Sequence, residues 1–178
     1  MTFLKVYIYG GECASSSRAY DDLWSYRPDL AVWEKHNIVS SGGIRPDDRP
    51  GKLIGAKFVA VRTGLYLFGG CIFDSTECSL WFLNTETFQF YKIRTFGSDQ
   101  PSNLLHASLI WHNHNEEDYL YLFGGFKHLL GPQDSFYRLQ VILYTLFFYF
   151  KNPFFQSLMQ RMSRLYKCPI KLLSAGSE

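Results

Sequence analysis

Short apolar and aromatic runs alternate with polar, turn-rich stretches along the first 140 residues of the chain. The runs at residues 58–61, 65–68 and 107–111 are four or five residues long and rich in β-branched or aromatic side chains. Runs of this length and composition predict β-strands rather than helices. Residues 62–64 and 113–118 separate neighbouring runs and have the composition of hairpin turns.

One pattern occurs three times. An apolar strand that ends in a glycine pair is followed, after a polar stretch, by a second strand-like segment at residues 22–26, 79–83 and 135–139. Successive glycine pairs are 59 and 55 residues apart. The residues that mark the repeat are Gly10, Gly11, Trp24, Tyr26, Trp33, Gly69, Gly70, Trp81, Gly124 and Gly125.

We expect the glycine pairs to have a structural role. Glycine accepts a positive φ and lets a neighbouring chain approach closely, which a residue with a Cβ does only at a cost. A phosphate-binding loop would need a helix directly after the glycines, and no helical pattern follows them.

The pattern resembles the kelch repeat, in which a strand ending in Gly-Gly is followed by a spaced Tyr and Trp in a unit of about 50 residues. The first copy has the full signature, whereas Leu83 and Phe90 replace the two aromatic residues in the second, and the third lacks the last aromatic residue. The resemblance covers roughly residues 5–139. It implies one four-stranded antiparallel blade of a β-propeller for each repeat.

The expected fold is therefore all-β, a partial kelch β-propeller with blades near residues 4–38, 55–93 and 105–140. The first blade lacks its innermost strand, the second is complete, and the third has three strands. The expected strands are residues 4–9, 22–26 and 31–36, then 56–61, 65–69, 79–83 and 88–93, then 106–112, 119–123 and 135–139.

About two and a half blades are too few to close a ring, which typically has four to eight. Open blade faces and strand edges favour association with other chains. We therefore expect either a piece of a longer ring or half of an assembly, with self-association as one outcome.

Residues 141–178 depart from the repeat. Residues 141–150 form an uncharged apolar run, and residues 152–168 have the apolar spacing and basic opposite side of a short amphipathic helix. This tail is either an interfacial membrane anchor, a cover for the last blade, or a segment foreign to the fold.

Charge and cysteine content narrow the class of partner. The chain has 18 Lys/Arg and 16 Asp/Glu, and the repeat region has no basic cluster, which argues against a nucleic-acid surface. The four cysteines lack zinc-site spacing, and a chain of this size needs no disulfides. No secretion signal is visible, so we expect a cytoplasmic or nuclear protein.

Candidate chemistry is sparse. His112 and His114 alternate on one expected strand, yet spacing provides no third metal ligand, and a solvated hairpin tip explains them equally well. No nucleophile motif is present, and we predict no metal or cofactor. A copper oxidase-like propeller enzyme remains an alternative, because some kelch-like propellers have that activity.

We expect a non-enzymatic module that binds another protein or a peptide. Kelch proteins commonly bind partners through the loops that here correspond to residues 12–19, 37–52, 71–78, 94–103 and 126–133. The resemblance implies a substrate-recognition adaptor or a scaffold. The side chains best placed to meet acidic groups are Arg18, Arg45, Arg49, Lys127 and His128.

Overall fold

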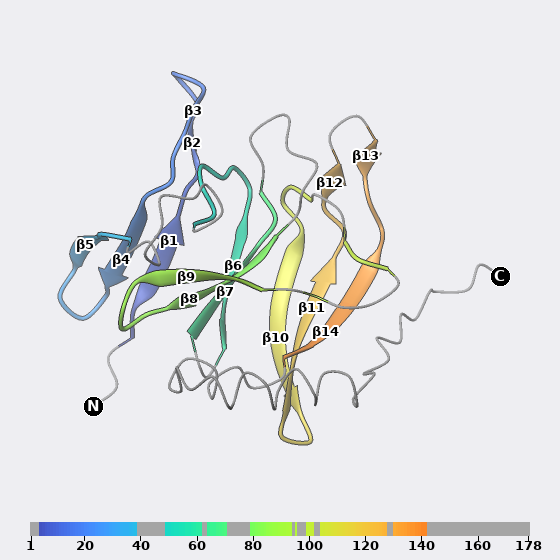
Figure 1. The fold of residues 1–178 in the computed structure, drawn as a ribbon. Helices are drawn as coiled ribbons and strands as arrows, with labels where there is room; N and C mark the ends of the chain where they lie inside the picture. The colour runs from blue at the N-terminus through green and yellow to red at the C-terminus, as the bar shows by residue number, and fades with distance from the viewer. Residues whose placement is uncertain are drawn as a thin grey trace, which may run out of the picture.

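The computed structural model describes residues 4–38, 49–61, 64–70, 79–93, 95, 99–101, 104–127 and 130–141. This part of the chain is all-β, with antiparallel pairing throughout and no helix. Three sheets stand beside one another in chain order, and two short ribbons project from one end of the molecule (Figure 1).

The three sheets share one strand order. Sheet 1 consists of β1 (Val6–Tyr9), β4 (Leu23–Arg27) and β5 (Val32–His36). Sheet 2 consists of β6 (Lys57–Val61), β7 (Gly64–Phe68), β8 (Leu80–Asn84) and β9 (Gln89–Ile93). Sheet 3 consists of β10 (Ser108–His114), β11 (Glu117–Phe123) and β14 (Phe136–Val141).

Each of these strands lies within two residues of the limits expected from the sequence. As expected, β1 has no inner partner among the described residues, whereas β7 pairs with β6 and β11 pairs with β10. β6 also contacts both β10 and β1, so the first strand of sheet 2 lies between sheets 1 and 3.

Two segments that were expected to be loops contain short ribbons. β2 (Glu12–Cys13) pairs with β3 (Arg18–Ala19), and β12 (Phe126–Lys127) pairs with β13 (Gly131–Pro132). Pairs of two-residue strands have no hydrophobic alternation, so periodicity does not predict them.

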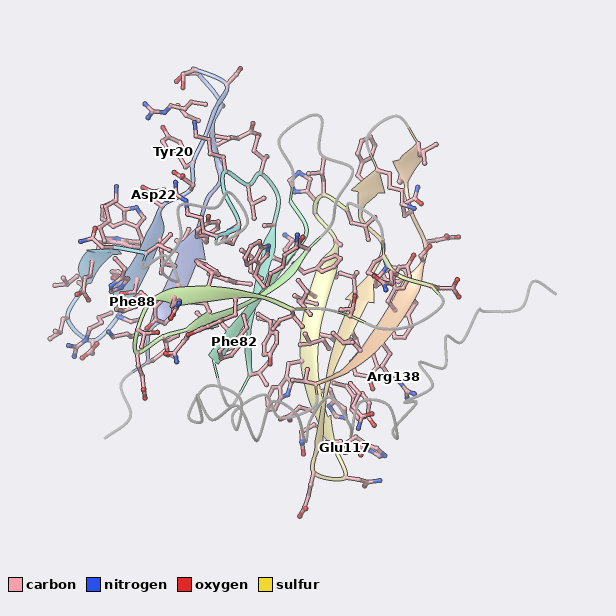
Figure 2. All side chains as sticks on the ribbon, viewed as in Figure 1. Tyr20, Asp22, Phe82, Phe88, Glu117 and Arg138 are labelled. Atoms are coloured by element: carbon pink, nitrogen blue, oxygen red, sulfur yellow. The ribbon has the colours of Figure 1, made fainter. Side chains whose placement is uncertain are left out.

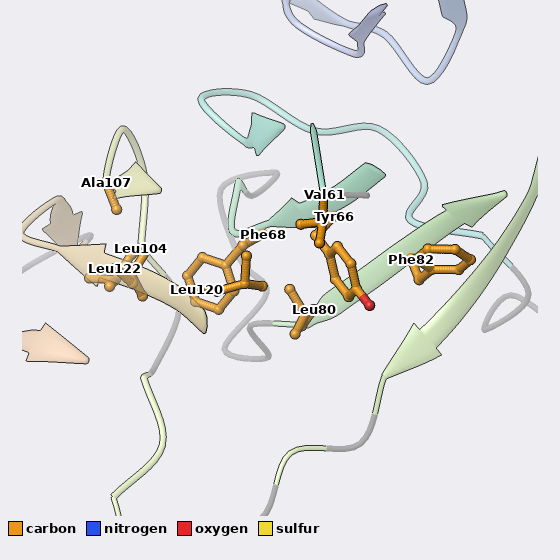
Figure 3. Close-up of a cluster of buried hydrophobic side chains, with 9 residues drawn as sticks. All are labelled: Val61, Tyr66, Phe68, Leu80, Phe82, Leu104, Ala107, Leu120 and Leu122. Atoms are coloured by element: carbon orange, nitrogen blue, oxygen red, sulfur yellow. The ribbon is translucent and has the colours of Figure 1, made fainter. Parts of the chain in front are cut away.

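The sheets pack face to face through the alternate side chains of their strands. Between sheets 2 and 3, Tyr66 and Phe68 of β7 pack in a cluster with Leu120 and Leu122 of β11 (Figure 3). Between sheets 1 and 2, the buried cluster consists of Tyr9, Leu23, Leu65, Leu67, Trp81, Leu83 and Phe90. Sheet 2 is therefore buried on both faces.

The expected helical tail falls on residues 142–178, which lie outside the described residues. In the part of the chain that the structure describes, no helix has the length and apolarity needed to cross a membrane.

Candidate functional site

The β2–β3 ribbon leaves sheet 1 at the first glycine pair. The Gly10 N–H donates to the Asp22 carbonyl at 3.1 Å, and the Tyr20 N–H donates to the Gly11 carbonyl at 2.9 Å. These two hydrogen bonds hold together the strands at the base of the ribbon, so the ribbon projects from the sheet on a paired stem.

The β12–β13 ribbon leaves sheet 3 in the same way. The Gly124 N–H donates to the Ser135 carbonyl at 3.0 Å, and the Gln133 N–H donates to the Gly125 carbonyl at 2.8 Å. Both ribbons project from the same end of the molecule (Figure 1). We call this the ribbon end and define it by residues 12–22, 49–56, 104–106 and the described part of 126–133. Glu117 lies at the opposite end from Tyr20 (Figure 2).

Backbone hydrogen bonds connect the ribbon end from one sheet to the next. Leu53, which leads into sheet 2, accepts from the Gly11 N–H at 2.7 Å and donates to the Tyr20 carbonyl at 3.1 Å. Leu104, which leads into sheet 3, accepts from the Gly70 N–H at 3.1 Å. Backbone hydrogen bonds therefore join sheet 1 to the start of sheet 2, and sheet 2 to the start of sheet 3, at the base of the ribbon end.

The basic side chains predicted to bind a partner have different surroundings at this end. Arg18 is exposed on β3, with its guanidinium 5.6 Å from the centre of the Tyr20 ring. Lys127 is half-buried on β12. Arg49 forms an ion pair with Asp21 at 3.1 Å. Arg45 and His128 lie outside the described residues.

A carboxylate next to the ribbon is held in its charged form. The Trp24 indole N–H donates to Asp22 at 2.9 Å, and Lys35 lies 3.3 Å from the same carboxylate oxygen. The hydrogen bond from Trp24, with the smaller effect of Lys35, lowers the pKa of Asp22 below its usual value. The adjacent Asp21 forms an ion pair with Arg49, so both neighbouring aspartates have side-chain partners.

The aromatic residues of the repeat occupy two environments. Tyr26 and Trp33 lie with ring centres 4.7 Å apart, and Trp33 is 52% exposed. Trp81 is buried in sheet 2 and meets Phe90 edge-on at 6.4 Å. Position in the outer or the central sheet, rather than residue type, decides whether these rings are buried.

A buried polar pair was not foreseen. Ser25 is fully buried, His36 is 7% exposed, and a hydrogen bond of 2.7 Å joins the Ser25 hydroxyl to the His36 Nε2. The His36 ring stacks on Phe88 of sheet 2 with 4.0 Å between ring centres, and Figure 2 shows Phe88 beside sheet 1. Ser25 lies on β4 and His36 on β5, so the two residues come together only through the register in which these strands pair.

Cys13 lies at the base of the β2–β3 turn. Its sulfur is 3.1 Å from the Ser15 hydroxyl, and hydrogen bonds from Ser15 and Ser16 lower the pKa of this thiol to about 7. Cys71, Cys78 and Cys168 lie outside the described residues.

The candidate metal ligands lie on the opposite end from the ribbons. His112 and His114 are both exposed on β10, with ring centres 6.5 Å apart. Nearby, Asp118 is buried and accepts hydrogen bonds from Trp111 at 3.0 Å and Asn113 at 2.8 Å. Among the described residues, no group of three or more His, Cys, Asp or Glu is placed to hold a metal ion.

Comparison of the chain with protein-family models and with curated proteins finds no match.

Proposed function

We propose that this chain is part of a kelch-type β-propeller that binds another protein, through an acidic segment, at the ribbon end. Three sheets with the same strand order, the same glycine-pair geometry and face-to-face packing support the propeller. Fold alone does not assign a function, so the binding role is argued from the ribbon end itself.

The observation that carries the binding role is the position of the two ribbons. They leave equivalent points of sheets 1 and 3, project from the same end, and each bears a cation, Arg18 on β3 and Lys127 on β12. Exposed strands supported by a rigid scaffold are typical of binding surfaces. Arg18 is the stronger candidate for contact with a carboxylate, because its planar guanidinium forms two parallel hydrogen bonds.

Arg49 has a different role in this proposal. Its ion pair with Asp21 and the hydrogen bonds of Leu53 hold residues 49–53 against the base of the β2–β3 ribbon. Arg49 therefore positions the ribbon, while Arg18 and Lys127 contact the partner.

An array of synthetic 12-residue peptides of varied charge, incubated with the full chain, tests the proposal. We expect selection of peptides rich in Asp and Glu, and at least about tenfold weaker binding of those peptides by Arg18→Glu and by Lys127→Glu, since each reversal replaces an attraction with a repulsion. Lys5→Glu is the matched control, because Lys5 is exposed just before β1, whereas the β2–β3 ribbon follows the other end of that strand.

Two results would contradict the proposal. One is the absence of any charge preference among the peptides that bind. The other is an equal loss of binding in Lys5→Glu and Arg18→Glu, which would mean that overall charge rather than the ribbon end attracts the peptides.

A further inference from the structure

Each sheet has two different faces, which are distinguished by alternate residues of the strand before the glycine pair. In sheets 2 and 3, Leu65, Leu67, Leu120 and Leu122 point toward the preceding sheet and are between 1% and 8% exposed. Tyr66 and Phe68 of sheet 2 point toward the following sheet and are 3% and 7% exposed. We call the side of a sheet that points toward the sheet before it in the chain its preceding face, and the other side its following face. Both contacts between neighbouring sheets pack the following face of one sheet against the preceding face of the next.

In sheet 1, none of the residues that the structure describes covers the preceding face. By alignment of the glycine pairs, Val6 and Ile8 of β1 correspond to Leu65 and Leu67, yet each is 45% exposed. Their cross-strand neighbours in the register, Tyr26 and Trp24, continue this face across β4, and Trp33 extends it onto β5. We call these five residues the first open face.

In sheet 3, none of the described residues covers the following face. Phe123 corresponds to Phe68 and to Tyr9, which are 7% and 8% exposed, but Phe123 is 52% exposed. Phe136, opposite Phe123 in the register, is 46% exposed, whereas the corresponding Leu80 is 5% exposed. The second open face consists of Ile110, Tyr121, Phe123 and Phe136.

The first open face is a preceding face and the second is a following face. Faces of these two kinds pack together between sheets 1 and 2 and again between sheets 2 and 3. We propose that they pack together a third time between copies: sheet 3 of one chain covers sheet 1 of a second chain, and the second chain's sheet 3 covers sheet 1 of the first. Burial of apolar residues that are about half exposed in the single chain drives this contact.

A second copy fits better than an unrelated partner, because it continues a contact that already exists between sheets 1 and 2 and between sheets 2 and 3. A contact between unlike faces closes into a ring when the rotation between subunits allows it. Two copies with three sheets each make six, which is within the range of four to eight blades in closed propellers.

The ring of six sheets rests on the proposed propeller, whereas the contact between the open faces does not. Binding of acidic peptides at the ribbon end is a separate measurement on the same variants. Failure of the dimer and failure of the proposed function are therefore distinguishable.

Sedimentation velocity of the full chain over a range of concentrations tests the inference. We expect a dimer, and at least about 30-fold weaker dimerisation for Ile8→Arg on the first open face and for Phe123→Arg on the second. Leu30→Arg is the control, because Leu30 is 56% exposed in the turn between β4 and β5 and belongs neither to the two open faces nor to the ribbon end. Val6→Arg and Phe136→Arg form a second pair of variants in case either of the first two fails to keep the melting temperature of the wild type.

Mixing the two variants identifies the geometry. The Ile8→Arg chain keeps an intact second face and the Phe123→Arg chain keeps an intact first face, so the mixture forms one sound contact and yields a mixed dimer that neither variant forms alone. A monomer at every concentration, a dimer that survives Ile8→Arg, or open-ended polymers in place of a dimer would each overturn the inference.

Discussion

Gly69 and Leu104 approach so closely that a Cβ on Gly69 would lie 2.5 Å from the Leu104 carbonyl oxygen. The same oxygen accepts a hydrogen bond from the Gly70 N–H at 3.1 Å. Gly10 repeats the relationship with Leu53, where the corresponding Cβ would lie 2.6 Å from the carbonyl oxygen. At both sheet boundaries, the chain entering the next sheet thus lies directly on the glycine pair, and a side chain at the first glycine would displace it.

This relationship predicts that Gly69→Ala lowers the free energy of unfolding by about 3 kcal/mol. About 1 kcal/mol is the cost of an L-residue at the φ of +71°, and the remainder is the contact with the Leu104 carbonyl. Gly51→Ala is the matched control, because Gly51 has a φ of +72° but a Cβ there would meet nothing within 4 Å, so we expect a loss of about 1 kcal/mol. Urea unfolding followed by tryptophan fluorescence measures both, and equal losses would rule out the contact as the cause.

The buried His36 predicts that the protein is less stable in mild acid. Burial, which is the largest effect, and the charge of Lys5 lower the pKa of His36 below its ordinary value of 6.5, while Glu34 opposes them. The unfolded chain therefore binds the proton more readily than the folded chain, and stability is full above about pH 6.5 and falls as the pH drops from there through the folded pKa. Urea midpoints at pH 7.5 and pH 5.5 should show the loss. The loss should shrink in His36→Gln and persist in His112→Gln, which changes an exposed histidine.

Ala31 predicts a stabilising substitution. It ends the turn between β4 and β5 with φ at +54°, a conformation that L-residues adopt at a cost and glycine adopts freely. We expect Ala31→Gly to raise the free energy of unfolding by about 0.5 kcal/mol, after the greater entropy of glycine in the unfolded chain is subtracted.

Phe88 provides the contrast to Ala31, since it has the same φ at the end of the turn between β8 and β9 but stacks on His36. Phe88→Gly should destabilise the protein, because it removes this stacking between sheets 1 and 2. Thermal unfolding of both variants checks the pair, and a lower melting temperature for Ala31→Gly would contradict the assignment of strain to that residue.

Cys13 predicts a thiol that reacts near neutral pH. Hydrogen bonds from Ser15 and Ser16 lower its pKa to about 7, so the alkylation rate with iodoacetamide should reach half of its maximum near that pH. The measurement uses a variant with serine at Cys71, Cys78 and Cys168, so that only Cys13 reacts. Adding Ser15→Ala should move the midpoint to higher pH, and a midpoint near 9 in the parent variant would contradict the role of the hydrogen bonds.

The strands could be predicted from the sequence because the signals that form them are local. Alternating apolar residues, β-branched and aromatic content and turn residues each act over a few positions. The β8–β9 turn illustrates this, since the Asn84 side chain accepts hydrogen bonds from the backbone of Glu86 and Thr87 within the turn itself. The glycine pairs also predicted the ends of these strands, because any other residue at Gly10 or Gly69 would place a Cβ against a neighbouring carbonyl oxygen.

The candidate site could be predicted only in part. Arg18 and Lys127 were singled out as charged residues within expected loops, and they do lie on projecting ribbons. The ion pair that engages Arg49 with Asp21 could not be predicted, because it joins segments that come together only when residues 49–53 fold against sheet 1.

Only the tertiary structure decided which apolar residues are buried. Ile8 and Leu67 occupy the same place in their repeats, before a glycine pair and on the same side of the strand, yet they are 45% and 1% exposed. The difference comes from sheet 1, which covers Leu67, whereas none of the described residues covers Ile8. By itself, the sequence determined where strands and turns form, because those signals lie within each repeat; burial depends on the neighbouring repeat, and so it was decided by the packing of the sheets.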